Sequence, residues 1–458
     1  MHNKLPVPPD PQLQEDIKLL CDEYMRYNPF QPELYNRYNV KRGLRNADGT
    51  GVLAGITQIC NVHGYLLNEG EKVPIDGELI YRGINIQSII HGCRIEGRFC
   101  FEETAYLLLQ GRLPNSQRLD QFNHLLAEAR ELPTDFTEDI IMKVASPNIM
   151  NMLARSVLAL YTYDYRPEDT SVENVMRQSI ELIARMPSIM AAAYQVKRRI
   201  YDGRSMYLHN PNPEFSTAQN ILRMLRSDKQ FTDEEAQLLD LCLMLHSDHG
   251  GGNNSTFAVR VLTSSGTDTY SAISAGIGSL KGPRHGGANF KVIQQLEMLK
   301  ENIKNWEDDA EIASYLRRVV NKQAGDGSGL IYGMGHAVYT KSDPREKILK
   351  ENAVKLAKGT DFEGEFQLLD AVERLSPDIL REKWGSERSV CANIDLYSGL
   401  VYRMLGIPDE LHTPLFAIAR TSGWSAHRLE ELCTNNRIIR PAYKPISTLK
   451  PYVPLGDR

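Results

Sequence analysis

One segment of the sequence can fold only as a helix that is covered by protein on every side. Thr232 and Glu235 form the T-x-x-E pattern of a capping box, which predicts a helix from this point to about His246. The interior positions of that helix are apolar almost all round: Leu238, Leu239, Leu241, Leu243, Met244 and Leu245. A helix without a polar face is stable only inside a core, so we expect this helix to be buried and to deliver the polar residues 246–249 from inside the core.

Helical spacing of apolar residues recurs along the chain, and the predicted fold class is mainly α. We expect further helices at 13–24, 103–110, 116–131 and 288–303, around Ile221, and in the stretches that end at Gly359 and Gly406. Residues 51–86 differ, because Gly and Asn break their short apolar runs. This pattern predicts a small β element near the N-terminus, with residues 78–84 as its clearest strand.

Length and composition limit the class of protein. A chain of 458 residues exceeds one compact core, which indicates two lobes or one domain inserted in another. The net charge of -5 gives no electrostatic footprint for nucleic acid or an acidic membrane, although it leaves room for a local cationic pocket. No apolar stretch approaches the roughly 18 residues of a membrane span, and residues 1–16 lack the apolar region of a signal peptide. The seven cysteines form no CxxC pair, so we expect a reducing, cytoplasmic environment.

Four polar segments lie in apolar or Gly-rich surroundings, and the first is His246-Ser-Asp-His249-Gly-Gly-Gly. Two histidines three residues apart could share a helix face and bind a metal ion, or they could belong to a cap and loop at the helix end. The segment lacks the HExxH form and a nearby glutamate, so we expect no metal site.

The second segment, Lys281-Gly-Pro-Arg-His285-Gly-Gly, places His285 at or just before the start of the helix expected at 288–303. The positive end of a helix disfavours imidazolium. A neutral His285 would be a hydrogen-bond donor suited to a developing enolate oxygen. Alternatively, His285 is a turn residue beside glycines that supply backbone freedom.

The third segment runs from Tyr332 to Glu346 and predicts the start of a helix. Asp343 suits the N-cap, Pro344 suits the first helical position, and Glu346 would complete a capping box. Arg345 is unexpected, because a cation in the first turn opposes the helix dipole at a cost of ~0.3–1 kcal/mol. That cost is explained if Arg345 and the helix end jointly hold an anion, while an exposed arginine without a role remains the alternative.

The fourth segment contains an aspartate and leads to two arginines. Asp395 precedes an apolar-periodic helix, so a plain N-cap explains it as well as a chemical function does. Arg420 ends the run 414–420, which is too apolar for a solvent face, and a buried arginine requires an anionic partner, internal or bound. Arg440, just before Pro441, could equally be a surface residue.

Taken in order, the motifs HSDHGGGN, GSLKGPRHGGAN, GMGHAVYTKSDPR and NIDLYSGLVY resemble those of the citrate synthase family. The sequences GVLAGIT and ELIYRGINI resemble the same family, and the resemblance covers about residues 51–441. It implies a citrate-synthase-like, two-domain, all-helical fold. It also implies an enzyme that condenses acetyl-CoA with oxaloacetate and hydrolyses citryl-CoA, with small-molecule substrates and no cofactor.

The resemblance also implies roles for single residues. Asp395 would take a proton from the acetyl methyl group, His285 would stabilise the enol or enolate oxygen, and His336 would polarise the oxaloacetate ketone. Oxaloacetate would be bound by His249, Arg345, Arg420 and Arg440. Arg440 would reach in from a neighbouring subunit, so the minimal assembly implied is a homodimer. These roles agree with the need of a carbon acid for a positioned base together with an oxyanion donor.

The family pattern further implies a large helical domain, residues 1–286 and 395–458, and a small inserted domain, residues 287–394. Closure of the small domain after oxaloacetate binds would create the acyl-CoA site. Contacts to CoA would come from Gly333, Met334, Gly335 and Lys341. Many relatives carry an arginine four residues after the third-motif histidine, where this chain has Thr340, so Lys341 would have to supply the charge for the CoA phosphate.

Three rival functions remain open at this point. The nearest is a 2-methylcitrate synthase that uses propionyl-CoA with the same catalytic set, because one methyl group is worth only about 1–3 kcal/mol of discrimination. A second is a metal-dependent hydrolase that uses His246, His249 and another histidine. The third is a non-catalytic metabolite-binding relative, which the joint presence of Asp395, His285 and His336 disfavours because binding alone needs no base.

Overall fold

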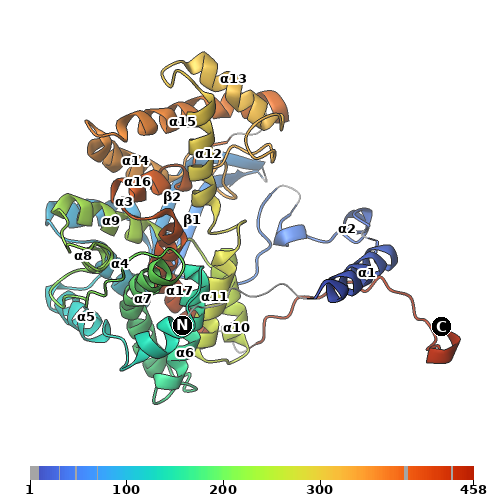
Figure 1. Ribbon diagram of the computed structural model, residues 1–458, viewed down its shortest axis with the longest axis horizontal. Coiled ribbons are helices and arrows are strands. Elements are labelled where there is room, and N and C mark those ends of the chain that lie inside the picture. Colours follow the sequence, from blue (N-terminus) through green and yellow to red (C-terminus); the bar gives the residue numbers. More distant parts are fainter. Residues whose placement is uncertain (1–9, 30, 47–48, 70, 386–389, 435–436) are drawn as a thin grey trace. The chain divides into compact units, whose positions relative to one another are not determined.

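The computed structural model describes residues 10–29, 31–46, 49–69, 71–385, 390–434 and 437–458, which form two compact units. One unit combines the described parts of residues 1–54 with residues 438–458, and the other is residues 55–437. The larger unit is built of helices with one small sheet (Figure 1), so the predicted mainly α class is confirmed. None of the described helices is both long and apolar enough to cross a membrane.

The smaller unit contains the first predicted helix. Its elements are α1 (Pro11–Tyr27), α2 (Glu33–Arg37), η1 (Arg42–Leu44) and η5 (Leu455–Asp457). Asp10 caps α1 by accepting a hydrogen bond of 2.9 Å from the backbone N of Gln12. The apolar stripe of α1 is about half exposed: Leu13 50%, Ile17 48% and Leu20 65%. The prediction that residues 1–16 carry no signal peptide rests partly on residues 1–9, which lie outside the described residues.

The predicted β element is an antiparallel sheet of β1 (Cys60–Asn68), β2 (Glu71–Tyr81) and β3 (Ile84–Asn85) in the order β1-β2-β3. Cys60 pairs with Tyr81 and His63 with Glu78, and the register shifts after His63. The strand predicted at 78–84 is too long, because Arg82 and Gly83 turn the chain with φ of 51° and 85°. β2 therefore ends at Tyr81.

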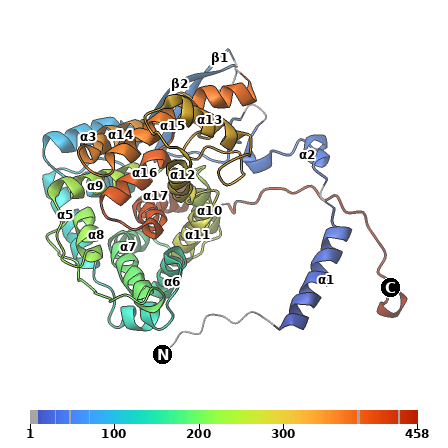
Figure 2. The ribbon, with the colours of Figure 1, turned by 45° about the horizontal axis from the view of Figure 1, so that its top comes forward.

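The helices of the larger unit follow one another along the chain, with long connections at 201–216 and 321–343 (Figures 1 and 2). They are α3 (Ile86–Ile95), α4 (Phe101–Gln110), α5 (Ser116–Ala129), η2 (Thr137–Met142), α6 (Ile149–Leu160), η3 (Tyr161–Tyr163), α7 (Val172–Ile200), α8 (Thr217–Leu225), α9 (Asp233–His246), α10 (Asn254–Ser264), α11 (Thr269–Lys281), α12 (Ala288–Asn302), α13 (Asp309–Val320), α14 (Pro344–Ala357), α15 (Glu363–Trp384), α16 (Asp395–Met404), η4 (Asp409–Leu411) and α17 (His412–Thr434).

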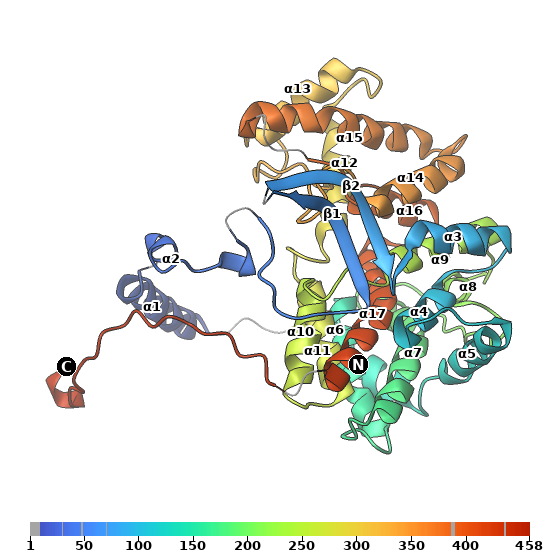
Figure 3. The same cartoon turned by 180° about the vertical axis from the view of Figure 1, so that it is seen from behind.

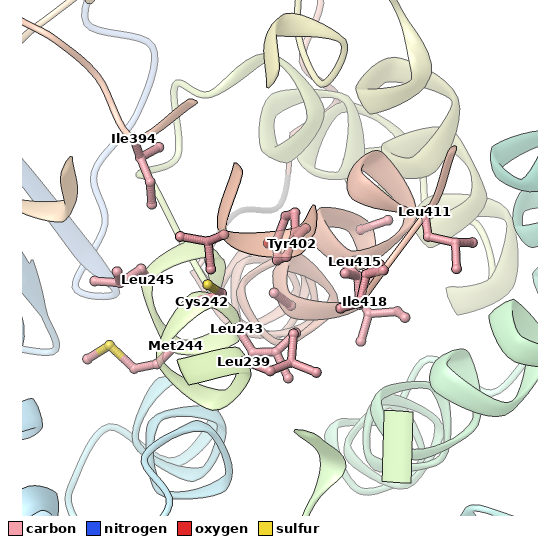
Figure 4. Close-up of a cluster of buried hydrophobic side chains, with 14 of the residues drawn as sticks. Leu239, Cys242, Leu243, Met244, Leu245, Ile394, Tyr402, Leu411, Leu415 and Ile418 are labelled. Atoms are coloured by element: carbon pink, nitrogen blue, oxygen red, sulfur yellow. The ribbon is translucent and has the colours of Figure 1, made fainter. Parts of the chain in front are cut away.

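The fully apolar helix predicted after Thr232 is α9, and its capping box is complete in both directions. Every residue of α9 from Leu238 to His246 is buried. The helix packs against α4, α8, α14 and α17. Figure 4 shows Leu239, Cys242 and Leu243 of α9 facing Tyr402 and Ile418, from α16 and α17. The requirement for protein on every side of α9 is thus met by several layers of helices.

The last long helix, α17, contacts many of the other helices of the larger unit. It packs against α4, α7, α9, α10 and α11, and Figure 3 shows it passing behind the strands toward α10 and α11. The helices α13 and α15 pack on each other at the end of the unit opposite α6 in all three views. The predicted small domain, residues 287–394, is not one of the two compact units and stays a prediction.

Candidate active site

The end of α9 delivers a short polar segment into the core. Gly423 of α17 touches this segment so closely that a Cβ there would lie 2.4 Å from the Ser247 carbonyl oxygen. The hydroxyl of Tyr81 donates a 3.0 Å hydrogen bond to the Asp248 carbonyl oxygen. The backbone of residues 247–249 is therefore fixed from both sides, and it leads directly to His249.

The two histidines of this segment have different environments. His246 Nδ1 lies 2.8 Å from the Cys242 carbonyl oxygen, and burial lowers the pKa of His246 to about 3. His246 is therefore a neutral core histidine. His249 has a buried Nε2 without a partner in the described part of the chain. Burial, followed by Arg345, lowers the pKa of His249 well below its usual value.

His336 lies beside His249, with ring centroids 5.0 Å apart and the rings nearly perpendicular. Backbone N–H groups of Val338 and Tyr339 donate to His336 Nδ1 at 3.1 and 3.0 Å. An Nδ1 that accepts two hydrogen bonds carries no proton, so the neutral ring holds its proton on Nε2. The structure thus presents His336 as an Nε2–H donor.

Two glycines place His336 next to the segment that contains the candidate base. Gly333 and Gly335 have φ of +84° and +95°, which other residues rarely adopt. The N–H of Gly335 donates to the Cys391 carbonyl oxygen at 2.7 Å, and Asn393 Nδ2 donates to the Gly335 carbonyl oxygen at 2.8 Å. The loop at 333–336 and the residues before α16 are therefore held together as a pair.

Asp395 is the first residue of α16, and Ile394 occupies the N-cap. The N-cap explanation of Asp395 is therefore wrong. The backbone N–H of Asp395 donates a hydrogen bond of 2.9 Å to Asn393 Oδ1. The Asp395 carboxylate makes no hydrogen bond to the residues that the structure describes, and burial raises its pKa to about 6. A carboxyl group with this pKa is suited to accept a proton near neutral pH.

Arg345 is 5% exposed, which excludes an exposed arginine without a role. Its Nε and Nη2 donate to both oxygens of Asp343, at 3.1 and 2.7 Å. Asp343 also caps α14 by accepting from the Arg345 N–H at 3.0 Å. The cation in the first turn is thus balanced by an internal carboxylate, and the charge of Arg345 acts on His249 and Asp395.

The predicted capping box of α14 is wrong in its second half. Asp343 caps the helix as expected, and Pro344 takes the first position. The Glu346 side chain does not close the box, because its Oε1 is buried without a partner among the described residues. Burial, followed by the charge of Glu373, raises the pKa of Glu346 to about 8. Packing of α14 against α15 and α16 therefore outweighs the local capping preference.

Arg420 is fully buried in α17. Its Nε donates to the His246 carbonyl oxygen at 2.7 Å, while Nη1 and Nη2 have no partner among the described residues. Burial lowers the pKa of Arg420, and the charge of Asp248 opposes that effect. A buried guanidinium with a free edge is a binding site for an anion, because the uncompensated charge is costly.

His285 lies three residues before α12, as predicted. The Ser255 N–H points at its Nε2 at 3.4 Å, and Ser255 Oγ lies 3.0 Å from the same atom. An accepting Nε2 leaves the ring proton on Nδ1. Burial, followed by the charge of Arg420, lowers the pKa of His285 to about 4. Burial rather than the helix dipole is therefore the main cause of its neutrality.

The candidate site residues are linked by the charges of the two buried arginines. Arg420 exerts a charge effect on Asp395, His249 and His285, and Arg345 does so on Asp395 and His249. The fold thus brings together a carboxyl base, neutral histidine donors and two guanidinium groups. Such a set can bind a small dianion and stabilise negative charge on an oxygen while a carbon-bound proton is removed.

A second layer of polar residues behind this set is absent from the sequence-based prediction. His427 Nε2 lies 3.2 Å from Asp248 Oδ2, and Arg260 Nη2 donates to His427 Nδ1 at 2.7 Å. Arg260 is in turn paired with Glu430 and Glu431. The motif HSDH contained Asp248, but Arg260 and His427 lie within helices, where no local signal separates them from surface residues.

Lys341 and Arg440 are the two remaining residues predicted for the site. Lys341 is 58% exposed, and its Nζ is 2.8 Å from Asp76 Oδ2 on β2. Arg440 is exposed and belongs to the smaller unit, so its predicted role in a neighbouring subunit stays a prediction.

Within the described ranges, no three His, Cys, Asp or Glu side chains are grouped to hold a metal ion.

Comparison with known proteins gives a consistent result. A family model described as "Citrate synthase, C-terminal domain" matches residues 46–442. Citrate synthase of Synechocystis sp. is 32% identical over 84% of this chain and 89% of its own length. The enzyme of Acidithiobacillus ferridurans is 33% identical over 89% of this chain and 97% of its own length.

Solved structures agree. Citrate synthase from Pyrobaculum aerophilum superimposes with a TM-score of 0.72 at 30% identity, covering 89% of this chain and 94% of the other. The ternary complex of the Thermoplasma acidophilum citrate synthase with carboxymethyl coenzyme A and oxaloacetate gives a TM-score of 0.73 at 26% identity, covering 92% and 99%.

Proposed function

Because the chain belongs to the citrate synthase family of transferases, we propose that it condenses acetyl-CoA with oxaloacetate and hydrolyses the resulting citryl-CoA to citrate and CoA. The observation that carries this proposal is the free edge of the buried Arg420 guanidinium beside Asp395. Anion binding alone would need the arginine but not an aspartate with a pKa of about 6.

In this reaction Asp395 takes a proton from the methyl group of acetyl-CoA. The Nδ1–H of His285 donates to the thioester oxygen, where charge develops as the enol or enolate forms. The nucleophilic carbon then attacks the ketone carbon of oxaloacetate, and the ketone oxygen receives a proton from His336 Nε2–H. Water finally cleaves the thioester, which releases CoA as a thiol.

Oxaloacetate offers two carboxylates, which suit the two guanidinium groups. Arg420 would bind one carboxylate through Nη1 and Nη2, and His249 and the outer edge of Arg345 would contact the rest of the molecule. Arg440 of a neighbouring subunit would complete the site in a homodimer. The oxaloacetate bound to the Thermoplasma acidophilum enzyme supports this choice of substrate.

Coenzyme A would contact the backbone at Gly333, Met334 and Gly335. Many relatives carry an arginine at the position of Thr340. In this chain Lys341 would supply the positive charge for a CoA phosphate instead. Its ion pair with Asp76 means that the phosphate must compete with an existing partner. Closure of residues 287–394 over the larger domain would keep water from the enolate until the carbon–carbon bond has formed.

A cytoplasmic location is part of the proposal. It is supported by the cysteines, all seven of which are free.

The test is release of free CoA thiol that depends on oxaloacetate, measured side by side with acetyl-CoA and propionyl-CoA in excess chelator. We expect faster turnover of acetyl-CoA, and its loss in Asp395→Ala. The matched control is Asp409→Ala, which removes a half-buried aspartate that pairs with Arg403 outside the site. A preference for propionyl-CoA would show a 2-methylcitrate synthase instead. Loss of activity in chelator would favour the metal-dependent hydrolase, and no thiol release from either substrate would overturn the proposed function.

A further inference from the structure

Successive turns of α17 contact successive residues of the segment that leads to His249. The Gly423 N–H donates to the Ser247 carbonyl oxygen at 3.2 Å. One turn later, His427 Nε2 lies 3.2 Å from Asp248 Oδ2. Residues four apart lie on the same face of a helix, so one face of α17 holds both residues that precede His249.

The Asp248 carboxylate also holds the residue that follows His249. Its Oδ2 accepts a hydrogen bond of 3.0 Å from the Gly250 N–H. Burial opposes ionisation of Asp248, but the effects of His427, Arg420 and the Gly250 N–H outweigh it and keep the pKa of this carboxyl below its usual value. An ionised oxygen accepts stronger hydrogen bonds than a neutral one. His249 therefore lies between two residues that the same charged oxygen joins.

Arg260 of α10 fixes the orientation of the His427 ring. Its Nη2 and Nε donate to His427 Nδ1 at 2.7 and 3.2 Å. Because a guanidinium can only donate, Nδ1 is an acceptor and the ring proton lies on Nε2, facing Asp248. Arg260 is itself paired with Glu430 and Glu431. Asp248, Arg260 and His427 are all buried, so the ring cannot turn without breaking hydrogen bonds that no water replaces.

We infer that His427 is a positioning residue for the oxaloacetate site, because it fixes the backbone on both sides of His249 through the Asp248 carboxylate. The inference rests on the proposed function, in which His249 contacts oxaloacetate. His427 acts only through Asp248 in this scheme, and Arg260 sets its direction. Asp395 and His285 lie outside residues 247–250, so a change at His427 should alter the affinity for oxaloacetate more than the rate of the chemical step.

Two amide variants of His427 separate its donor from its bulk. The glutamine amide reaches about as far from Cα as Nε2 of the ring does, and the asparagine amide about as far as Nδ1. His427→Gln therefore keeps a donor for Asp248, whereas His427→Asn removes it. Calorimetric titration of the full chain with oxaloacetate should give a Kd at least about tenfold weaker for His427→Asn, the effect of losing a hydrogen bond to a charged group. For His427→Gln we expect a Kd within about threefold of the wild type.

Variants of Asp248 show whether His427 acts through this carboxylate. Asp248→Asn keeps an oxygen that can accept both hydrogen bonds, so it should bind oxaloacetate nearly as the wild type does. Asp248→Ala loses both and should bind weakly. Adding His427→Asn to Asp248→Ala should cause no further loss, whereas a role of His427 in packing alone would give the same loss on both backgrounds.

Two more variants control for stability. Arg428→Met removes hydrogen bonds from the same helix outside the segment, and it should bind oxaloacetate as the wild type does. Arg260→Lys keeps the charge for Glu430 and Glu431 but lacks the forked donors that orient the His427 ring. It should also weaken binding, so it replaces His427→Asn in the test if that variant does not fold.

Thiol release measured on the same proteins distinguishes the two proposals. In His427→Asn the KM for oxaloacetate should rise with the Kd, while kcat changes by less than about threefold. A wild-type protein that binds oxaloacetate but releases no thiol would overturn the proposed function, and the Kd values would still test His427. The inference is overturned if the wild type does not bind oxaloacetate, if His427→Asn and Arg260→Lys bind it as tightly as the wild type, or if His427→Asn weakens binding equally with and without the Asp248 carboxylate.

Discussion

At the scale of single residues, the site depends on groups whose ordinary state is changed by burial. Asp395, His285 and His249 are largely withdrawn from water, and each has its pKa shifted toward the neutral form, with burial as the largest cause. A neutral histidine can donate from one ring nitrogen while the other accepts, and a carboxylate removed from water is a stronger base.

The pH dependence of the reaction should report Asp395. Its folded pKa of about 6 lies above the usual value, so the base is protonated, and inactive, at acidic pH. We expect kcat/KM to fall about tenfold per pH unit below pH 6. A profile measured from pH 4.5 to 8 checks this, and a fall only below pH 4 would contradict it.

The same shift affects stability in a defined direction. Because Asp395 binds its proton more tightly in the folded state, stability from this group falls as pH rises from about 4 to 6. Asp395→Asn should therefore stabilise the protein at pH 7, by about 3 kcal/mol at most, and leave it unchanged at pH 3.5. Urea unfolding at the two pH values measures this difference.

Two arginines of α17 provide a matched comparison. Arg420 and Arg428 are both fully buried, but Arg428 donates to Thr269 Oγ1, Thr263 Oγ1 and the Thr267 carbonyl oxygen. Arg428→Met should lower stability by about 2–5 kcal/mol, because it leaves these acceptors unpaired, without changing KM for oxaloacetate. Arg420→Met should raise that KM at least about a hundredfold with little loss of stability. Equal effects of the two variants on KM would contradict the anion-binding role of Arg420.

The sequence allowed part of this residue-scale picture to be predicted. The apolar run before Arg420 indicated its burial, and the motifs led to the three catalytic candidates. Arg260 and His427 could not be found in this way, because their importance arises from a meeting of α10 and α17 that no local pattern contains. The failed capping box at Glu346 has the same cause.

At the scale of elements, helix ends were predictable where the sequence carries caps. α9 and α4 begin or end as expected because Thr232 with Glu235, and Gly111 at φ 78°, fix them locally. α5 ends at Ala129 and not at residue 131, and β2 ends before the turn at Arg82. The long helix α7 was not singled out, and Pro187 inside it interrupts the usual signals.

The contact between α17 and the end of α9 should tolerate no side chain. A Cβ at Gly423 would lie 2.4 Å from the Ser247 carbonyl oxygen and 2.5 Å from Asp248 Oδ1. Gly423→Ala should cost about 1–3 kcal/mol or more and lower kcat/KM, because it displaces the segment that carries His249. Gly278→Ala in α11 is the control, since nothing lies within 4 Å of its Cβ position, and it should stabilise by about 0.5–1 kcal/mol. Urea unfolding with steady-state kinetics distinguishes them.

At the scale of the whole molecule, the site assembles residues that are far apart in the chain. His249, His336 and Arg420 come from three stretches separated by more than eighty residues of sequence, and only the packed helices bring them together. The order of motifs indicated that such an assembly exists. The distances within it, and the division into domains, depend on long-range packing and could not be read from the sequence.

The proposed domain closure must couple the binding of the two substrates. Oxaloacetate on Arg420 and His249 should increase the affinity for a CoA ligand at least about fivefold, the lower end of usual coupling energies. Calorimetric titration with CoA, with and without oxaloacetate, measures this coupling, and Arg420→Met is the variant in which it should vanish. An affinity for CoA that does not depend on oxaloacetate would contradict closure.

The hydrogen bonds that join Gly335 to Cys391 and Asn393 have a consequence for timing. They tie the loop that holds His336 to the residues just before Asp395, so hydrogen bonds maintain the spacing between these two side chains. In the proposed closure, these hydrogen bonds would keep the spacing of His336 and Asp395 while the site opens. The proposed site would then pass between open and closed states without a separate alignment of these two groups.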